Sequence, residues 1–303
     1  MSGFPAAVRI VEVGPRDGLQ NEAAEVATAA KIAFVDALSR AGHTAIEVSA
    51  FVSPRWVPQM ADAADVFAGI TRRSGVTYSA LVPNLAGLSR ARDAGVDEIA
   101  IFAAASETFS KRNINQSVVE SLDAYAAVCA EAARANLRVR AYLSTVFGCP
   151  FEGEVPVETV AAVAARLADM GAYEVALSDT IGIAHPGQIT PVLDAVTRRV
   201  PVNRLALHFH DTRGTALANV YAALHAGVTT FDASSGGLGG CPYAPGATGN
   251  LATEDLVYML DGLGIASGVS LSALITASRE IEAHVNHPLP SRVYRATVGR
   301  YGG

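Results

Sequence analysis

The chain has 303 residues, half of them apolar, and a formal net charge of −6 with its basic residues scattered. This length suits one large domain or two ordinary ones, and the apolar content is enough for a sizeable core. No basic stripe interleaved with aromatic residues occurs, which argues against nucleic-acid binding. No apolar run approaches the roughly 18 residues of a membrane span, so no membrane association is expected.

The N-terminal segment and the cysteine content indicate the cellular compartment. The first residues, MSGFPAAVRIVEVG, have neither the pattern of a secretory signal nor the Arg-rich pattern of a transit peptide. Cys129, Cys149 and Cys241 are too few, and odd in number, for a disulfide framework. We therefore expect a cytoplasmic protein.

Short runs rich in β-branched residues alternate with segments of helical apolar spacing along the chain. The runs predict strands at residues 8–13, 45–51, 77–82, 98–103, 138–145, 174–178, 205–210 and 230–234. Between the first two, Ile32, Val35 and Leu38 follow the spacing of a helix face. Strands separated by helices in this rhythm pair in parallel through right-handed crossovers. Eight such units predict an α/β fold, the closed (β/α)₈ TIM barrel.

Helix caps and the C-terminal segment complete this organisation. Ser117 and Glu120 fit a capping box, and Thr253 is the expected cap of the eighth barrel helix. A further helical segment follows at residues 270–287. No linker rich in proline, glycine or serine marks a second domain. We expect a single TIM-barrel catalytic domain over residues 1–303, with residues 270–303 as a C-terminal helical extension.

Polar residues gather where the predicted strands end, which is where the chemistry of such barrels lies. Arg16 and Asp17 follow the first strand in the turn GPRDG. Glu47 lies inside the second strand, an unusual place for a carboxylate without a partner. Asp179 follows the sixth strand. Charged groups therefore come from several strand ends at once.

The seventh strand ends in His208 and His210, whose spacing places both imidazoles on one face and Phe209 on the other. Two neutral imidazoles at the barrel mouth can share one divalent cation, to which Asp17 adds an anionic oxygen. Such a set suits Mn²⁺, Mg²⁺, Co²⁺ or Zn²⁺ and leaves positions open for substrate. The alternative is a pair of core histidines hydrogen-bonded to carbonyl groups. The charged residues on other strand ends favour the metal site.

The three cysteines have different expected roles. Cys241 lies in a glycine-dense loop after the eighth strand, where a thiol can donate or accept a proton. A structural thiol in a turn is the alternative. Cys129 shares a helical face with Leu122 and Tyr125 and is expected in the core, and Cys149 is expected to be a packed loop thiol.

Several long strings occur in this chain in the order found in a known family. VEVGPRDGLQNE, FVSPRWVPQM, CPFEG, SDTIG, HFHDT, GLGGCPYAPGATGN and LATEDLVYMLDGLGI resemble 3-hydroxy-3-methylglutaryl-CoA lyases, from about Arg9 to about Val269. The resemblance implies a metal-dependent TIM-barrel lyase that cleaves this acyl-CoA thioester to acetyl-CoA and acetoacetate, in leucine degradation and ketone-body formation. It also implies Mg²⁺ or Mn²⁺ as cofactor and a homodimer or higher homo-oligomer.

The resemblance extends to individual residues. It implies metal ligands at Asp17, His208, His210 and Asn250. It implies substrate-binding residues at Arg16, Gln20 and Asp179. Arg16 is similar to the cation beside the thioester carbonyl, Glu47 to a supporting catalytic carboxylate, and Cys241 to the catalytic thiol of a lid loop. His208 or Asp17 is then the candidate base for the substrate hydroxyl, since that proton must leave before the carbon–carbon bond breaks.

Two positions depart from the family pattern, and two other functions compete. Ala50 in IEVSAF and Ala176 in EVALSD stand where relatives carry hydroxyls, so the pocket is less polar and a larger 3-alkyl group is an alternative. Condensing relatives such as 2-isopropylmalate or homocitrate synthases share the arginine–aspartate and HxH elements. However, they usually have a different glycine loop and often a C-terminal regulatory region. A metal-binding barrel without catalysis is the remaining alternative, disfavoured because every residue of the set is present.

Overall fold

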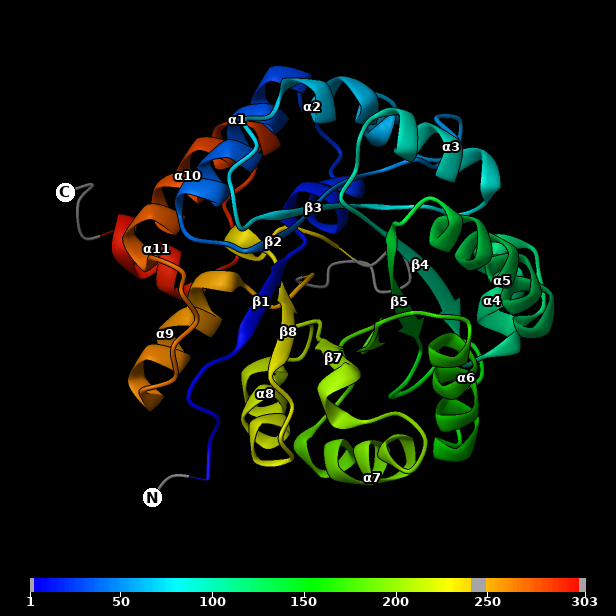
Figure 1. Ribbon diagram of the computed structural model, residues 1–303. Coiled ribbons are helices and arrows are strands. Elements are labelled where there is room, and N and C mark those ends of the chain that lie inside the picture. The colour runs from blue at the N-terminus through cyan, green and yellow to red at the C-terminus, as the bar shows by residue number, and fades with distance from the viewer. Residues whose placement is uncertain (1–2, 241–248, 300–303) are drawn as a thin grey trace.

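The computed structural model describes residues 3–240 and 249–299, in which eight parallel strands close into a barrel, with β8 paired to β1 (Figure 1). The strands are β1 Arg9–Glu12, β2 Ala45–Ala50, β3 Thr77–Leu81, β4 Glu98–Ala104, β5 Arg138–Ser144, β6 Glu174–Ser178, β7 Leu205–His208 and β8 Thr230–Ala233. The predicted TIM barrel is confirmed.

Helices separate the strands and cover the outside of the barrel (Figure 1). They are α1 Thr28–Arg40, α2 Ala63–Gly69, α3 Leu85–Asp93, α4 Glu107–Ile114, α5 Val118–Arg134, α6 Val157–Asp169, α7 Pro186–Thr197, α8 Ala216–His225, α9 Thr253–Leu263, α10 Leu271–Val285 and α11 Arg292–Val298. Short turns of helix lie at η1 Gly14–Gly18, η2 Pro58–Met60, η3 Val202–Arg204 and η4 Ser235–Gly237. In the described ranges no helix is both long and apolar enough to cross a membrane.

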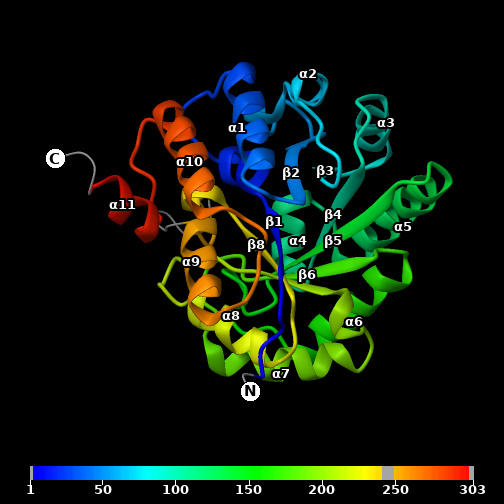
Figure 2. The ribbon, with the colours of Figure 1, turned by 60° about the vertical axis from the view of Figure 1, so that its left-hand side comes forward.

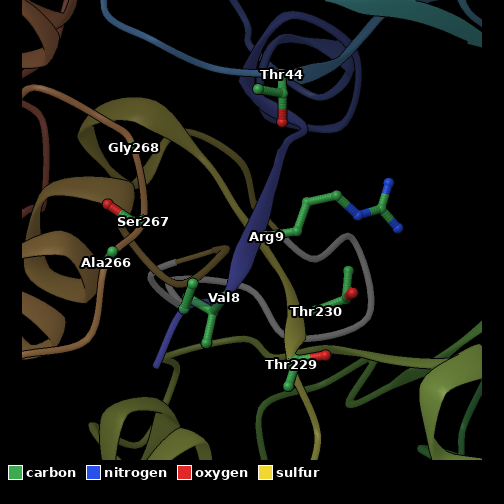
Figure 3. Close-up of a pocket in the computed structure, with 9 residues that line it drawn as sticks. Val8, Arg9, Thr44, Thr229, Thr230, Ala266, Ser267 and Gly268 are labelled. Atoms are coloured by element: carbon green, nitrogen blue, oxygen red, sulfur yellow. The ribbon is translucent and has the colours of Figure 1, made fainter. Parts of the chain in front are cut away.

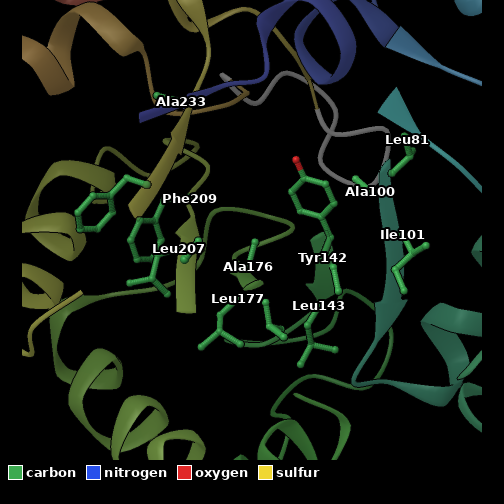
Figure 4. Close-up of a cluster of buried hydrophobic side chains, with 14 of the residues drawn as sticks. Leu81, Ala100, Ile101, Tyr142, Leu143, Ala176, Leu177, Leu207, Phe209 and Ala233 are labelled. Atoms are coloured by element: carbon green, nitrogen blue, oxygen red, sulfur yellow. The ribbon is translucent and has the colours of Figure 1, made fainter. Parts of the chain in front are cut away.

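The main hydrophobic core lies between the strands and the helices. Leu143, Leu177 and Leu207 are register partners on three neighbouring strands and are fully buried in one row (Figure 4). Alternate residues of the same strands point the other way, into the barrel, because side chains alternate along a strand. The outward row therefore packs against the helices, and the inward positions include polar residues such as Arg140 and His208.

The barrel interior contains a buried ion network that the sequence analysis did not predict. Arg140 of β5 donates from Nε to Glu174 of β6 at 2.7 Å and from its two terminal nitrogens to Asp232 of β8 at 2.7 and 3.1 Å. Arg9 of β1 adds a second ion pair to Glu174. Proteins tolerate buried charges when these are paired and hydrogen-bonded, as the side chains of this network are.

Helix α5 bears out two predictions. The Ser117 hydroxyl accepts from the Glu120 amide and the Glu120 carboxylate accepts from the Ser117 amide, so the capping box is present. Cys129 is buried on the same helix, as predicted. Cys149 is also a buried loop thiol, with its sulfur 3.0 Å from the Ser106 hydroxyl oxygen.

The prediction that Thr253 caps the eighth barrel helix is wrong. Helix α9 begins at Thr253 and its N-cap is Ala252, without a side-chain cap. The Thr253 hydroxyl instead donates to Glu12 Oε2 at 2.7 Å, because β1 brings a buried carboxylate that competes for it. The helical segment predicted at 270–287 is α10, which packs beside α1 (Figure 2).

Candidate active site

The turn η1, directly after β1, carries Arg16 and Asp17. The backbone amides of both residues donate to the Val13 carbonyl, at 3.2 and 2.8 Å, which winds the chain tightly at the end of the strand. A side chain at Gly18 would place its Cβ 2.8 Å from the Ser234 hydroxyl oxygen. Glycine at this position therefore lets the turn pack directly on the segment that follows β8.

Glu12 ties the η1 turn to the segment after β8. Its Oε1 accepts from the amides of Gly14 and Ser235, both at 2.8 Å, and its Oε2 accepts from the Thr253 hydroxyl. Complete burial raises the pKa of Glu12 to about 8, although these three donors oppose the shift. The carboxyl group thus joins both segments at the carboxyl ends of β1 and β8.

We expect Glu12→Gln to change how stability depends on pH. From the ordinary pKa of 4.5 up to about 8, the folded protein keeps a proton that the unfolded chain has released. The contribution of Glu12 to the free energy of unfolding is therefore highest below this window. It falls as pH rises through the window, by on the order of a few kcal/mol. The glutamine variant should lose most of this fall, as measured by urea unfolding at pH 5 to 8.5. The exposed Glu280→Gln is the control, and equal slopes in all three proteins would contradict this role.

Asp17, His208 and His210 meet at the carboxyl end of the barrel, as the sequence predicts. One potential ligand atom from each lies within 4.8 Å of those from the other two. The imidazole centroids are 5.2 Å apart, and His208 Nε2 lies 3.9 Å from Asp17 Oδ2. Both histidines are buried and Asp17 is partly buried.

Asn250 joins this group from the segment before α9. It forms an isolated bridge with His210, and its Nδ2 donates to Asp17 Oδ2 at 3.0 Å and to the Leu238 carbonyl at 3.1 Å. Asn250 Oδ1 and His210 Nδ1 are buried and have no hydrogen-bond partner in the described ranges. Buried acceptors normally have a partner, and a divalent cation would supply one for these two atoms. Such a cation also fits the two imidazoles and the carboxylate of this group.

The electrostatics keep these side chains in the forms that bind metal. Burial opposes ionisation of Asp17, but the Arg16 guanidinium and the neighbouring imidazoles outweigh it and lower the pKa of Asp17 to about 2. Burial, and then the proximity of His208, lowers the pKa of His210 to about 4. At neutral pH the site thus presents a carboxylate and a neutral imidazole, the states that metal ligation requires.

The Arg16 guanidinium is held between two carboxylates beside this group. Its Nε donates to Glu47 Oε2 at 2.6 Å, and a terminal nitrogen donates to Asp17. The Tyr142 hydroxyl also donates to Glu47 Oε2, at 3.0 Å. Burial raises the pKa of Glu47 while Arg16 opposes the shift. Glu47 therefore has the partner that its place inside a strand required.

Tyr142, Arg140 and Asp232 were not predicted from the sequence. The signal was present for two of them, because Arg140 and Tyr142 are two residues apart and so share one face of β5. A charged residue and a tyrosine alternating with apolar neighbours on a buried strand indicate a polar barrel interior.

Asp179 and Gln20 are the other expected substrate-binding residues, and Cys241 is the expected catalytic thiol. The Asp179 carboxylate accepts from the Ile183 and Ala184 amides, both at 3.0 Å, and burial raises its pKa to about 6. Asp179 therefore anchors the loop after β6. Gln20 is half-buried just after the η1 turn. Cys241 lies outside the described residues.

A cavity of about 550 Å³ lies at the other end of the barrel (Figure 3). Its lining includes Arg9, Thr44 and Thr230, which lie at or next to the amino ends of β1, β2 and β8. The histidines and Asp17 lie at the carboxyl ends of the strands. This cavity is therefore separate from the candidate active site.

The fold and these residues define a (β/α)₈ barrel with a prospective divalent-metal site at the carboxyl ends of its strands. The HMGL-like family model matches residues 7–281. A hydroxymethylglutaryl-CoA lyase of Bacillus subtilis (strain 168) is 53% identical over 289 residues, covering 95% of this chain and 97% of the relative. The chain belongs to the HMGL-like family.

Two further matches extend over 98% or more of the chain. A Pseudomonas aeruginosa protein named 3-hydroxy-3-isohexenylglutaryl-CoA/hydroxy-methylglutaryl-CoA lyase is 53% identical, covering 98% of this chain and 99% of its own. The structure of an HMG-CoA lyase from "Acenitobacter baumannii" in complex with coenzyme A and 3-methylmalate superposes with a TM-score of 0.92 at 38% identity. That match covers 100% of this chain and 98% of the other.

Proposed function

We propose that this protein is a divalent-metal-dependent lyase that cleaves 3-hydroxy-3-methylglutaryl-CoA to acetyl-CoA and acetoacetate. The observation that carries the proposal is the convergence of Asp17, His208, His210 and Asn250 beside Arg16. Relatives named hydroxymethylglutaryl-CoA lyase at 53% identity support the substrate, and the coenzyme A complex of a relative supports an acyl-CoA thioester.

The reaction needs a base, a cation beside the thioester and a proton donor. Asp17 removes the proton of the 3-hydroxyl in this proposal, because the free nitrogen of His208 would bind the cation. The carbonyl of acetoacetate then forms at C3 as the bond between C2 and C3 breaks, and the electron pair of that bond passes to the acetyl-CoA enolate. The Arg16 guanidinium, fixed by Glu47, stabilises the negative charge that develops on the thioester oxygen of the enolate. Cys241 supplies the proton to the enolate carbon. Gln20 and Asp179 line the substrate pocket in this proposal.

Asp17, His208, His210 and Asn250 would hold the cation. When bound, it would polarise the oxygens of the substrate hydroxyl and of the distal carboxylate. A mixed set of oxygen and imidazole ligands suits Mg²⁺ or Mn²⁺, which we propose as the cofactor. We also propose a single catalytic domain, a cytoplasmic location and a homodimer or larger homo-oligomer.

A second candidate substrate carries a larger 3-alkyl group. Ala176 is fully buried and is the register partner of Tyr142, whose hydroxyl contacts Glu47. A small apolar side chain therefore lies beside the candidate active site, and Ala50 is buried at the end of β2. The name of the Pseudomonas aeruginosa relative includes such a substrate, 3-hydroxy-3-isohexenylglutaryl-CoA.

Purified protein with Mg²⁺ or Mn²⁺ should release acetoacetate from 3-hydroxy-3-methylglutaryl-CoA. The same assay with the isohexenyl analogue tests the second substrate. Ala176→Ser should reduce kcat/KM for the longer substrate by about tenfold relative to the methyl substrate, because a hydroxyl makes the pocket smaller and more polar. Cleavage of the longer substrate alone would refute the methyl assignment and keep the chemistry. Cleavage of neither would refute the proposed function.

A further inference from the structure

Asp232 lies between the buried ion network and the candidate metal site. It belongs to β8, is 1% exposed, and its Oδ2 is 3.2 Å from His208 Nδ1. On its other side the Arg140 guanidinium donates to both carboxylate oxygens. Arg140 is held in turn by Glu174 at 2.7 Å. Asp232 is thus fixed from one side while it contacts His208 from the other.

This arrangement determines which nitrogen of His208 carries the proton. An ionised carboxylate only accepts hydrogen bonds, so Nδ1 must be the protonated nitrogen of a neutral His208. The Nε2 lone pair is then free on the side of the ring that lies 3.9 Å from Asp17 Oδ2. Histidine ligands of metals are commonly oriented in this way by a carboxylate on the second ring nitrogen.

His210 offers a comparison within the same site. Its Nδ1 is buried and has no hydrogen-bond partner in the part of the chain that the structure describes. Asp232 therefore contacts the His208 ring at Nδ1, whereas no described residue is hydrogen-bonded to the His210 ring at that atom.

We propose that Asp232 is a positioning residue that fixes the tautomer and ring orientation of His208 for metal binding. Arg140 holds Asp232 in place from inside the barrel. The inference rests on the metal site of the proposed function. Its tests need neither substrate nor turnover, so failure of the lyase assay and failure of this proposal are distinguishable.

The first test uses the unmodified, metal-free protein. Long-range ¹H–¹⁵N correlation spectra distinguish the two tautomers of a neutral imidazole, and His208→Gln identifies which signals belong to His208. We expect His208 to carry its proton on Nδ1. A proton on Nε2 would overturn the proposal, and this result does not depend on whether any variant of Asp232 folds.

The second test compares Asp232→Asn with Glu174→Gln. Both remove one anion from Arg140, but only Asp232 contacts His208. In Asp232→Asn the single amide oxygen should turn to Arg140, so the amide nitrogen faces His208 and moves the imidazole proton to Nε2. We expect Mn²⁺ binding, measured by calorimetry, to weaken by about 10- to 100-fold.

Glu174→Gln should leave Mn²⁺ affinity within about twofold of the unmodified protein, since only loss of an outer partner of a ligand costs the larger factor. Thermal unfolding of the metal-free variants measures the structural cost of each change separately. Equal losses of affinity in the two variants would show that the network only supports the fold, and would overturn the specific role of Asp232. Unchanged affinity in Asp232→Asn would overturn it as well.

Discussion

Replacing Asp17 with asparagine should weaken Mn²⁺ binding by at least about 100-fold, because losing a ligand should cost more than losing an outer partner. The substitution keeps the shape of the side chain and removes its charge, which the low pKa of about 2 maintains at neutral pH. Turnover should fall by at least about 1,000-fold at a limiting metal concentration, since the substrate hydroxyl loses both its metal and a candidate base. Calorimetry and acetoacetate release measure the two effects.

Asp211 provides the matched control for this substitution. It directly follows His210, but its carboxylate accepts from the Ala216 amide and from Arg292. Asp211→Asn should therefore keep metal affinity and turnover near those of the unmodified protein. If both variants lose metal to the same extent, or if Asp17→Asn binds Mn²⁺ normally, Asp17 is not a ligand.

Arg16→Gln should lower kcat by about 100- to 1,000-fold, the usual cost of removing one group that stabilises a developing oxyanion. Metal affinity should be unchanged or higher, because the change removes a positive charge beside Asp17 and leaves the ligands in place. This combination separates Arg16 from the ligands, whose loss lowers metal affinity and turnover together. Arg16→Lys should recover little activity, since lysine lacks the planar fork that reaches both Glu47 and Asp17.

Arg9→Gln tests whether removing any arginine that pairs with a buried carboxylate has the same effect. Arg9 also pairs with a buried carboxylate, Glu174, but at the other end of the barrel. Its substitution should lower the thermal midpoint with little effect on kcat. A similar fall of kcat in both variants would mean that Arg16 acts through stability, and an unchanged kcat in Arg16→Gln would remove it from the mechanism.

Much of the candidate site could be predicted from local patterns. The alternation of strands and helices predicts the barrel, and the spacing of His208 and His210 places both rings on one face. Glu47 is conspicuous because a carboxylate inside an apolar strand needs a partner. Thr253 shows the limit of this reasoning, since a cap pattern is local and Glu12, far away in the sequence, takes the hydroxyl.

The sequence by itself determined the barrel, the strand ends that carry the charged residues and the resemblance that predicts the ligand set. These features follow from periodicity and from strings of adjacent residues, which local chemistry controls. Only the tertiary structure decided which side chains meet across the barrel: Asn250 with Asp17, Tyr142 with Glu47, and Asp232 with His208. Closure of the barrel brings β8 against β1 and turns residues from different strands toward one interior. Those partners depend on register and on the direction of each side chain, which no single segment contains.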